Sequence, residues 1–213
     1  MAIVVRLTFN PFQENTYLVY DDTQECIVFD PGCYSAEEQR ELSDRIEALE
    51  LKPVRLINTH CHIDHVFGNA FIARTYGLEL EIHRGEAPVL AAVPEIARYF
   101  GVALPEPSPS PGRFLEAGEA VSFGNTRLQA LLTPGHSPAS LSFFCEEDRF
   151  VISGDVLFQG SIGRYDLPGG DLATLIDSIK SQLFPLGDDV IVHPGHGPST
   201  TIGAERKRNP FLI

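Results

Sequence analysis

The sequence predicts an α/β fold in which two β-sheets pack together with helices on the outside. Apolar stretches of strand length fall into two groups, one within residues 3–83 and the other within residues 121–192. Each group is accompanied by a segment with clear helical periodicity, residues 35–50 in the first case and 172–183 in the second. Because the chain has 213 residues and no break in composition, we expect a single domain over residues 1–213.

The helix of residues 35–50 is the clearest element of the first group. Ser35 and Glu38 have the spacing of a capping box, and apolar residues continue from there at helical period. Gly77 ends a second, shorter helix. The expected bounds are 3–8, 16–20, 26–29, 54–57 and 78–83 for the strands, and 35–50 and 70–76 for the helices.

The second group begins with a hairpin around Gly124-Asn125. Before it, residues 87–99 are expected to be helical but interrupted by Pro94. Four prolines in residues 101–112 exclude regular helix and central strand, so this segment is expected to be an exposed loop and a candidate rim or lid of the site. The remaining expected bounds are 121–123, 126–132, 141–145, 150–152 and 190–192 for strands, and 172–183 and 202–208 for helices.

The composition excludes several classes of partner. Sixteen basic against 29 acidic residues give a net charge of −13, which disfavours binding to nucleic acid. No apolar stretch reaches the length of a membrane span, and the early strand leaves no room for a signal peptide. The four cysteines show no paired spacing and are expected to be free thiols. We therefore expect a cytoplasmic protein that binds neither nucleic acid nor a membrane.

The most informative stretch is His60-Cys61-His62-Ile63-Asp64-His65, which directly follows the expected strand 54–57. Neutral imidazole is the commonest metal ligand in proteins, and three imidazoles with a carboxylate at one strand end predict a metal site. Neighbouring side chains on an extended segment point to opposite faces. If His60 and His62 face a metal, Cys61 therefore faces away from it.

Three further strand ends carry a ligand-type residue in a small, sharply turning loop. His136 ends Thr133-Pro134-Gly135-His136, Asp155 ends Ser153-Gly154-Asp155, and His196 lies in Pro194-Gly195-His196-Gly197. Glycine permits such turns because it has no side chain to clash. Each loop alone is a weak signal, but together with the histidine stretch they indicate one shared site.

The seven residues divide into the ligand sets of two metals. We assign His60, His62 and His136 to one ion and Asp64, His65 and His196 to the other. Asp155 remains, and a carboxylate with two oxygens can bridge two ions. Paired metals roughly 3.5–4 Å apart hold a reactive hydroxide, so no serine or cysteine nucleophile is needed. We expect zinc, with iron or manganese as alternatives, and take Asp64 and Asp155 as the catalytic carboxylates.

These motifs, in this order, resemble those of the metallo-β-lactamase superfamily. The turn Asp30-Pro31-Gly32 matches the first motif of that superfamily. The resemblance implies a four-layer αββα sandwich with metals at one edge of the two sheets. It also implies that Asp30 supports the metal site from behind the ligands, where it would order the loop or hold a histidine in one tautomer.

Within the superfamily, the chain is most similar to the short bacterial glyoxalase II-like proteins, which are related to hydroxyacylglutathione hydrolases. The segments that carry this similarity are Gly154–Phe158, Gly160–Arg164, Pro194–Gly197 and Asn209–Leu212. The resemblance implies hydrolysis of a thioester of the S-D-lactoylglutathione kind through a metal-bridging hydroxide. The chain departs from full-length glyoxalase II in lacking the C-terminal helical domain that contacts glutathione.

Three other residues have alternative interpretations. Arg164 could bind a substrate carboxylate through its planar guanidinium group, or it could form a salt bridge with Asp166 or Asp171. His193 is expected to be packed or to support a ligand rather than to bind metal. His83, at the end of an expected strand, is expected to be structural.

Other members of the superfamily offer alternative functions. The persulfide dioxygenases use one iron held by two histidines and an aspartate, but they typically have a Gly-Cys-Gly-Arg core where this chain has Gly160-Ser161-Ile162-Gly163-Arg164. A nucleic-acid-processing member would need a further domain and a less acidic chain. A binding protein with a decayed site is disfavoured by the intact ligand types.

Overall fold

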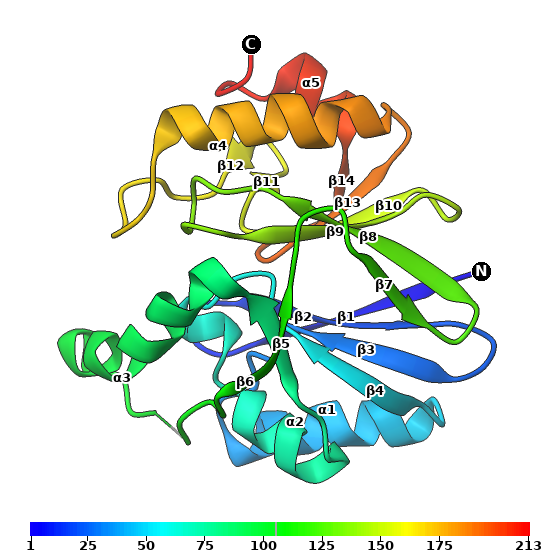
Figure 1. Cartoon of the computed structure of the whole chain (residues 1–213), viewed down its shortest axis with the longest axis vertical. Coiled ribbons are helices and arrows are strands. Elements are labelled where there is room, and N and C mark those ends of the chain that lie inside the picture. Colours follow the sequence, from blue (N-terminus) through cyan, green and yellow to red (C-terminus); the bar gives the residue numbers. More distant parts are fainter. Residues whose placement is uncertain (105) are drawn as a thin grey trace.

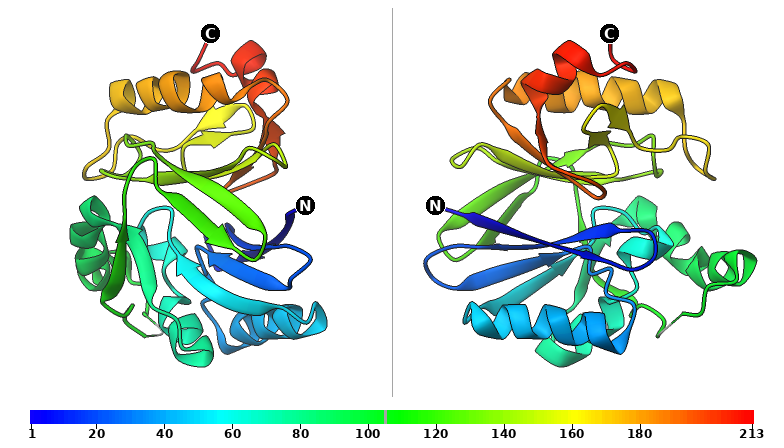
Figure 2. Two further views of the ribbon diagram at one scale, coloured as in Figure 1. Left: turned by 45° about the vertical axis from the view of Figure 1, so that its right-hand side comes forward. Right: turned by 180° about the vertical axis from the view of Figure 1, so that it is seen from behind.

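The computed structural model describes residues 1–104 and 106–213. Two six-stranded sheets pack face to face, and helices cover the outer face of each (Figure 1). The helices α1 and α2 lie on the first sheet, while α4 and α5 lie on the second. The two further views in Figure 2 show the same layers, with the C-terminus on the side of α5. The predicted αββα sandwich is confirmed.

The first sheet has the strand order β1-β2-β3-β4-β5-β6. Its first three strands are antiparallel, whereas β3, β4, β5 and β6 run parallel to one another. The carboxyl ends of β3 and β4 therefore lie at the same edge of the sheet. The elements of this half are β1 (Ile3–Phe9), β2 (Glu14–Tyr20), β3 (Glu25–Phe29), α1 (Ala36–Ala48), β4 (Lys52–Ile57), α2 (Asn69–Tyr76), β5 (Leu80–His83), α3 (Ala87–Phe100) and β6 (Pro111–Leu115).

The second sheet has the order β14-β13-β10-β9-β8-β7. Because β9 is antiparallel to both β8 and β10, and β13 is parallel to β10, the strands β8, β10 and β13 all end at one edge. The elements are β7 (Ala120–Phe123), β8 (Thr126–Leu132), β9 (Leu141–Cys145), β10 (Phe150–Gly154), β11 (Leu157–Phe158), β12 (Ser161–Ile162), α4 (Leu172–Ser178), β13 (Ile191–Pro194), β14 (Thr200–Thr201) and α5 (Ile202–Arg208).

Strands that are covered on both faces carry apolar residues on both sides. In β2, Tyr17 and Val19 point between the sheets, whereas Leu18 packs under the helices of the first layer. Phe29 and Phe143 join the two sheets, with ring centroids 4.9 Å apart. Each fully buried aromatic side chain of this kind contributes roughly 2–3 kcal/mol. This central layer fixes the relative position of the two sheets, and thereby of the strand ends.

The capping box of α1 forms as predicted. The Ser35 hydroxyl accepts a hydrogen bond from the amide of Glu38, and the Glu38 carboxylate accepts one from the amide of Ser35. The same carboxylate also accepts from the amide of Asn10, in the β1–β2 turn. The helix start is therefore tied to a neighbouring turn as well as capped.

Two predictions about prolines are wrong. The helix α3 continues through Pro94, because a proline removes only one backbone hydrogen bond and the face formed by Leu90, Val93 and Ala97 is buried. Pro111 begins strand β6 instead of belonging to a loop, which is tolerated because β6 is at the edge of its sheet. Pro105, in the same proline-rich segment, lies outside the described residues.

The helix expected over residues 172–183 is regular only to Ser178, and residues 179–183 form a π-helical turn. Among the described residues, no helix is long and apolar enough to cross a membrane. The cytoplasmic location stays a prediction.

His193 on β13 is packed, as predicted, and its burial makes a pH-dependent contribution to stability. Its ring lies edge-on against Tyr17 and Phe150, with centroids 5.6 and 5.8 Å away. Its Nδ1 lies 3.0 Å from the Ser199 hydroxyl. Burial lowers the pKa of His193 to about 4, from an ordinary value of 6.5. The unfolded chain therefore binds this proton more strongly, and stability is lost as the pH falls from 6.5 towards 4.

We predict that the His193→Gln variant lacks this pH-dependent loss. At pH 7 the variant should have a lower free energy of unfolding than the wild type, because packing is lost. At pH 5 this difference in unfolding free energy should be smaller by about 2 kcal/mol, because only the wild type is destabilised by protonation of His193. Urea unfolding of metal-free protein at the two pH values measures both differences. A difference that stays constant between pH 7 and pH 5 would contradict the prediction.

Candidate metal centre

The predicted site residues come together where strands of both sheets end. The stretch from His60 to His65 follows β4, and its last three residues form a single 3₁₀ turn. His136 follows β8, Asp155 follows β10 and His196 follows β13. Because β8, β10 and β13 end at the same edge of the second sheet, His136, Asp155 and His196 are brought to one place.

One group consists of His60, His62 and His136. The Nε2 atom of His136 lies 2.8 Å from Nδ1 of His62 and 3.2 Å from Nε2 of His60. His60 is fully buried and His136 is nearly so. One ring nitrogen of each histidine therefore points to a common position, and these three atoms form a group that could hold a metal ion.

The second group consists of Asp64, His65 and His196. The Oδ2 atom of Asp64 lies 3.1 Å from Nε2 of His196 and 3.8 Å from Nε2 of His65. These three atoms also form a group that could hold a metal ion. His196 is the more open member, with 26% of its side chain exposed, against 0% for His65. Substrate access is therefore expected on the side of His196.

Asp155 lies between the two groups. One carboxylate oxygen is 3.4 Å from Nε2 of His136 and 3.5 Å from Nε2 of His196. The other oxygen is 3.5 Å from Nε2 of His65. A carboxylate in this position contacts members of both sets, which is the arrangement expected of a bridging ligand.

The donor set fits two divalent metals. Nε2 of His65 and Oδ1 of Asp155 are buried, and neither has a hydrogen-bond partner among the described residues. Buried polar atoms normally have a partner, so an unsatisfied imidazole nitrogen facing an unsatisfied carboxylate oxygen indicates a shared cation. Nitrogen and carboxylate ligands suit zinc, iron and manganese alike.

Hydrogen bonds to the outer nitrogens fix the ring orientations. Nδ1 of His65 lies 3.1 Å from Asp30, Nδ1 of His136 lies 2.7 Å from the Arg164 carbonyl, and Nδ1 of His196 lies 3.1 Å from the Phe12 carbonyl. These partners are oxygen acceptors, so each Nδ1 carries the proton. The lone pair of each Nε2 is then directed at the centre.

Asp30 lies beside the outer nitrogen of His65, and its supporting role stays a prediction. Its carboxylate accepts hydrogen bonds from the Thr59 amide at 2.7 Å and from the Thr59 hydroxyl at 2.6 Å, in addition to its contact with His65. Its backbone has a φ of 46°, which is uncommon for a residue other than glycine. This local strain is offset by the hydrogen bonds that connect β3 to the histidine stretch.

The electrostatics favour neutral histidines in one group and a cation beside Asp155. Burial lowers the pKa of His62 to about 3, and burial with neighbouring imidazoles lowers that of His60 well below 6.5. Burial by itself raises the pKa of Asp155, but His65 and the other histidines bring it well below its usual range. The carboxylate is therefore ionised and attracts positive charge.

Cys61 points away from the metal groups, as expected. Its side chain packs in the core between the first sheet and its helices, and burial raises its thiol pKa well above 9. His83 is structural, since its ring accepts a hydrogen bond from the amide of Gly85. Arg164 pairs with Asp166 at 2.9 Å, while Asp171 instead caps α4.

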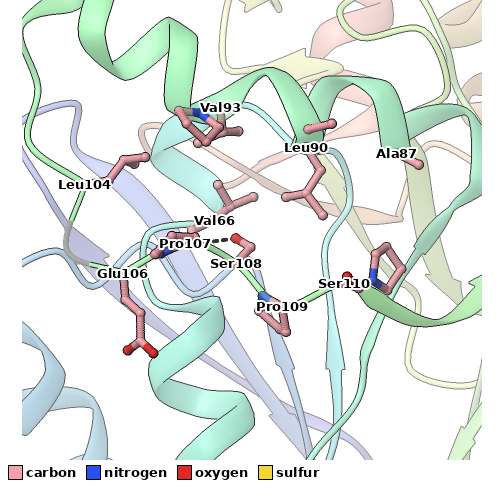
Figure 3. Close-up of a pocket in the computed structure, with 13 residues that line it drawn as sticks. Val66, Ala87, Leu90, Val93, Leu104, Glu106, Pro107, Ser108, Pro109 and Ser110 are labelled. Carbon is pink, nitrogen blue, oxygen red and sulfur yellow. Dashed lines mark hydrogen bonds between the residues drawn. The ribbon is translucent and has the colours of Figure 1, made fainter.

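The proline-rich segment reaches the chain directly after the ligand His65. Ser108 donates a hydrogen bond to the Val66 carbonyl at 3.3 Å, which Figure 3 shows as a dashed line. Between this segment and α3 lies a cavity of about 240 Å³, lined mainly by apolar residues such as Leu90 and Leu104. Its described lining includes none of the seven predicted ligands. The role of the segment as a rim or lid stays a prediction.

Several buried polar residues that contact the site were missed from the sequence. Asn15 donates hydrogen bonds to the carbonyls of Pro194 and Gly197, on either side of His196. Glu14 is fully buried near His65, and burial raises its pKa well above 4.5. Glu86 accepts hydrogen bonds from the amides of Cys61 and Ala139, in the loops that carry His60 and His136. Asn15 and Glu14 lie in a strand and Glu86 at a helix start, so no local pattern indicates their role.

Comparison with known proteins agrees with this geometry. The model of the metallo-beta-lactamase superfamily matches residues 9–196. The chain belongs to this superfamily. The hydroxyacylglutathione hydrolase GloC of Haemophilus influenzae is 38% identical over 202 residues, which covers 94% of this chain and 93% of GloC. The protein is accordingly a metallo-hydrolase of the metallo-beta-lactamase superfamily.

Two of the solved structures that resemble this chain combine coverage of nearly the whole chain with more than 30% identity. TTHA1623 in a di-iron-bound form has a TM-score of 0.88 and 40% identity, covering 98% of this chain and 100% of TTHA1623. The B3 metallo-beta-lactamase BLEG-1 has a TM-score of 0.89 and 34% identity, covering 99% of this chain and 100% of BLEG-1. The similarity therefore extends over the complete αββα sandwich.

We predict that Asp155→Asn impairs binding of both metals. The amide retains one oxygen but loses the charge that attracts a cation, so metal content should fall from about two ions per chain to one or fewer. Elemental analysis after gel filtration measures the number of metal ions per chain. The control Asp166→Asn, which removes an exposed carboxylate, should retain two ions. Unchanged metal content in Asp155→Asn would exclude its bridging position.

Proposed function

We propose that this protein hydrolyses a thioester of the S-D-lactoylglutathione kind, using two divalent metal ions. The observation that carries the proposal is the position of the Asp155 carboxylate within 3.5 Å of histidines from both potential metal groups. A mononuclear site would not need this arrangement. The 38% identity to GloC supports the thioester as substrate class.

In this proposal the ligands follow the two groups. His60, His62 and His136 would hold one ion, and Asp64, His65 and His196 would hold the other. Asp155 would supply a carboxylate to both. Bound metals supply a polarised carbonyl oxygen and a water of lowered pKa, so hydrolysis needs no covalent nucleophile. Zinc is the ion we favour, and the di-iron form of TTHA1623 supports iron as an alternative, with manganese a further one.

The residues of this chain orient the ligands and the substrate. Asp30 and the carbonyls of Arg164 and Phe12 keep the imidazole lone pairs aimed at the centre. Asp64 and Asp155 are the carboxylates beside the reacting atoms. Because Asp64 and His196 are the partly exposed ligands of the second group, the thioester is expected to arrive on their side.

Arg164 is the candidate contact for a substrate carboxylate. The Arg164 side chain is 66% exposed, and its partner Asp166 is exposed as well. An exposed pair of this kind contributes little stability, so Asp166 can be exchanged for a substrate carboxylate at small cost. We also propose that residues 1–213 form a single domain.

The direct test is turnover of S-D-lactoylglutathione by metal-loaded protein. We expect hydrolysis that disappears on treatment with a chelator and returns when zinc is added. Parallel assays with glutathione persulfide under oxygen, and with a β-lactam, distinguish the other chemistries of the superfamily. Oxygen uptake by iron-loaded protein without thioester turnover would overturn the proposal in favour of a persulfide dioxygenase.

We predict that Arg164→Ala raises KM for the glutathione thioester about 5- to 20-fold with little change in kcat, because a charged hydrogen bond is worth about 1.5–3 kcal/mol and part is lost to solvent. A thioester of an uncharged thiol, such as N-acetylcysteamine, should be unaffected. The control Arg127→Ala removes an exposed arginine from the opposite end of β8. Equal changes for both thioesters would contradict a carboxylate contact.

A further inference from the structure

Glu86 lies at the start of α3 and is fully buried. Its carboxylate accepts hydrogen bonds from the Cys61 amide at 2.9 Å, from the Ala139 amide at 2.8 Å and from the Ser137 hydroxyl at 2.6 Å. Among the described residues it forms no ion pair with an arginine, lysine or histidine. A carboxyl group buried without a counter-charge loses its hydration, and these hydrogen bonds offset that loss.

The donors to Glu86 lie next to predicted ligands or, for Ala139, three residues after one. Cys61 lies between His60 and His62, while Ser137 and Ala139 follow His136. The two loops are about 75 residues apart in the chain, and a single side chain links both. All three ligands of one proposed ion therefore lie beside donors to Glu86, whereas none of these donors adjoins Asp64, His65 or His196.

The packing around Glu86 is close enough to transmit its position. A Cβ atom at the preceding Gly85 would lie 2.5 Å from Cβ of Ala139, so only glycine allows this approach. The helix start and the His136 loop thus pack in direct contact, and the hydrogen bond from the Cys61 amide to Glu86 joins the histidine stretch to them. A change in the length or charge of Glu86 must move at least one of the two loops.

The second ligand set has anchors other than Glu86. Asp30 contacts His65, and the Phe12 carbonyl and Asn15 hold the loop of His196. These contacts come from β2, β3 and the β1–β2 turn, not from α3. Asp30 also accepts hydrogen bonds from Thr59, next to His60, so it supports both sets. Among the described residues Glu86 accepts hydrogen bonds only beside His60, His62 and His136, so a change at Glu86 acts first on that set.

We infer that Glu86 is a positioning residue for one ion of the pair, the ion held by His60, His62 and His136. It sets the distance between the two loops and thereby the affinity for that ion relative to the other. This inference rests on the two-metal centre of the proposed function. It assigns a role to a carboxylate that does not bind metal itself.

The test is the affinity of each of the two metal sites in Glu86→Gln. In the variant, one amide hydrogen faces a backbone N–H donor, so one loop must shift. We expect affinity for one of two ions to fall about 10- to 100-fold, as is typical for partners of metal ligands, while the other changes less than about twofold. Competition with a chromophoric chelator measures both. Cobalt(II) spectra should lose the same bands as in His136→Ala.

Two further variants separate positioning from general stability. Glu205→Gln is the matched control, because Glu205 is also buried and accepts hydrogen bonds from Gly160, Thr200 and Asn209, none of which adjoins a predicted ligand. It should leave the two metal affinities unchanged even if it lowers Tm. Ser137→Ala removes one donor and should weaken the same ion as Glu86→Gln to a smaller extent, which keeps the inference testable if Glu86→Gln does not fold.

The outcomes distinguish this inference from the proposed function. If the wild type binds two ions and only one of the two metal affinities falls in Glu86→Gln and Ser137→Ala, the result supports both the two-metal centre and the role of Glu86. If the wild type binds two ions but the variants weaken both sites equally, or weaken neither, the role of Glu86 is overturned while the two-metal centre stands. Wild-type protein that holds fewer than two ions would overturn the two-metal centre, and the inference with it.

Discussion

The position of Asp155 is the constraint on which the rest of the site depends. A buried carboxylate surrounded by imidazoles is stable only if positive charge is shared among them, either as protons or as metal ions. Its two oxygens face different histidines, so the charge must be distributed over two positions rather than one. The loops, their turns and the outer hydrogen bonds serve to keep these donors at those positions.

The packing of the two sheets makes this arrangement rigid. β8, β10 and β13 end at one edge of the second sheet, and β3 and β4 end at the facing edge of the first. The aromatic contact between Phe29 and Phe143 lies between the sheets and resists sliding of one against the other. Ligands from both sheets can therefore be held together although the loops that carry them are short.

Much of this arrangement is predictable from the sequence, because it depends on local patterns. Ligand types at strand ends predict the two metal groups, and the capping box at Ser35 predicts the start of α1. The course of α3 through Pro94 is not predictable locally, since tertiary burial outweighs the cost of the proline. The contacts of Glu86 and Asn15 join residues far apart in sequence, so only the folded chain reveals them.

The chain order of the ligands has a consequence for biosynthesis. The set of His60, His62 and His136 is complete in the growing polypeptide about 60 residues before His196 is added. At a ribosomal rate of about 5–20 residues per second, that interval lasts several seconds. During translation, the residues of one proposed ligand set are therefore all present in the chain several seconds before those of the other.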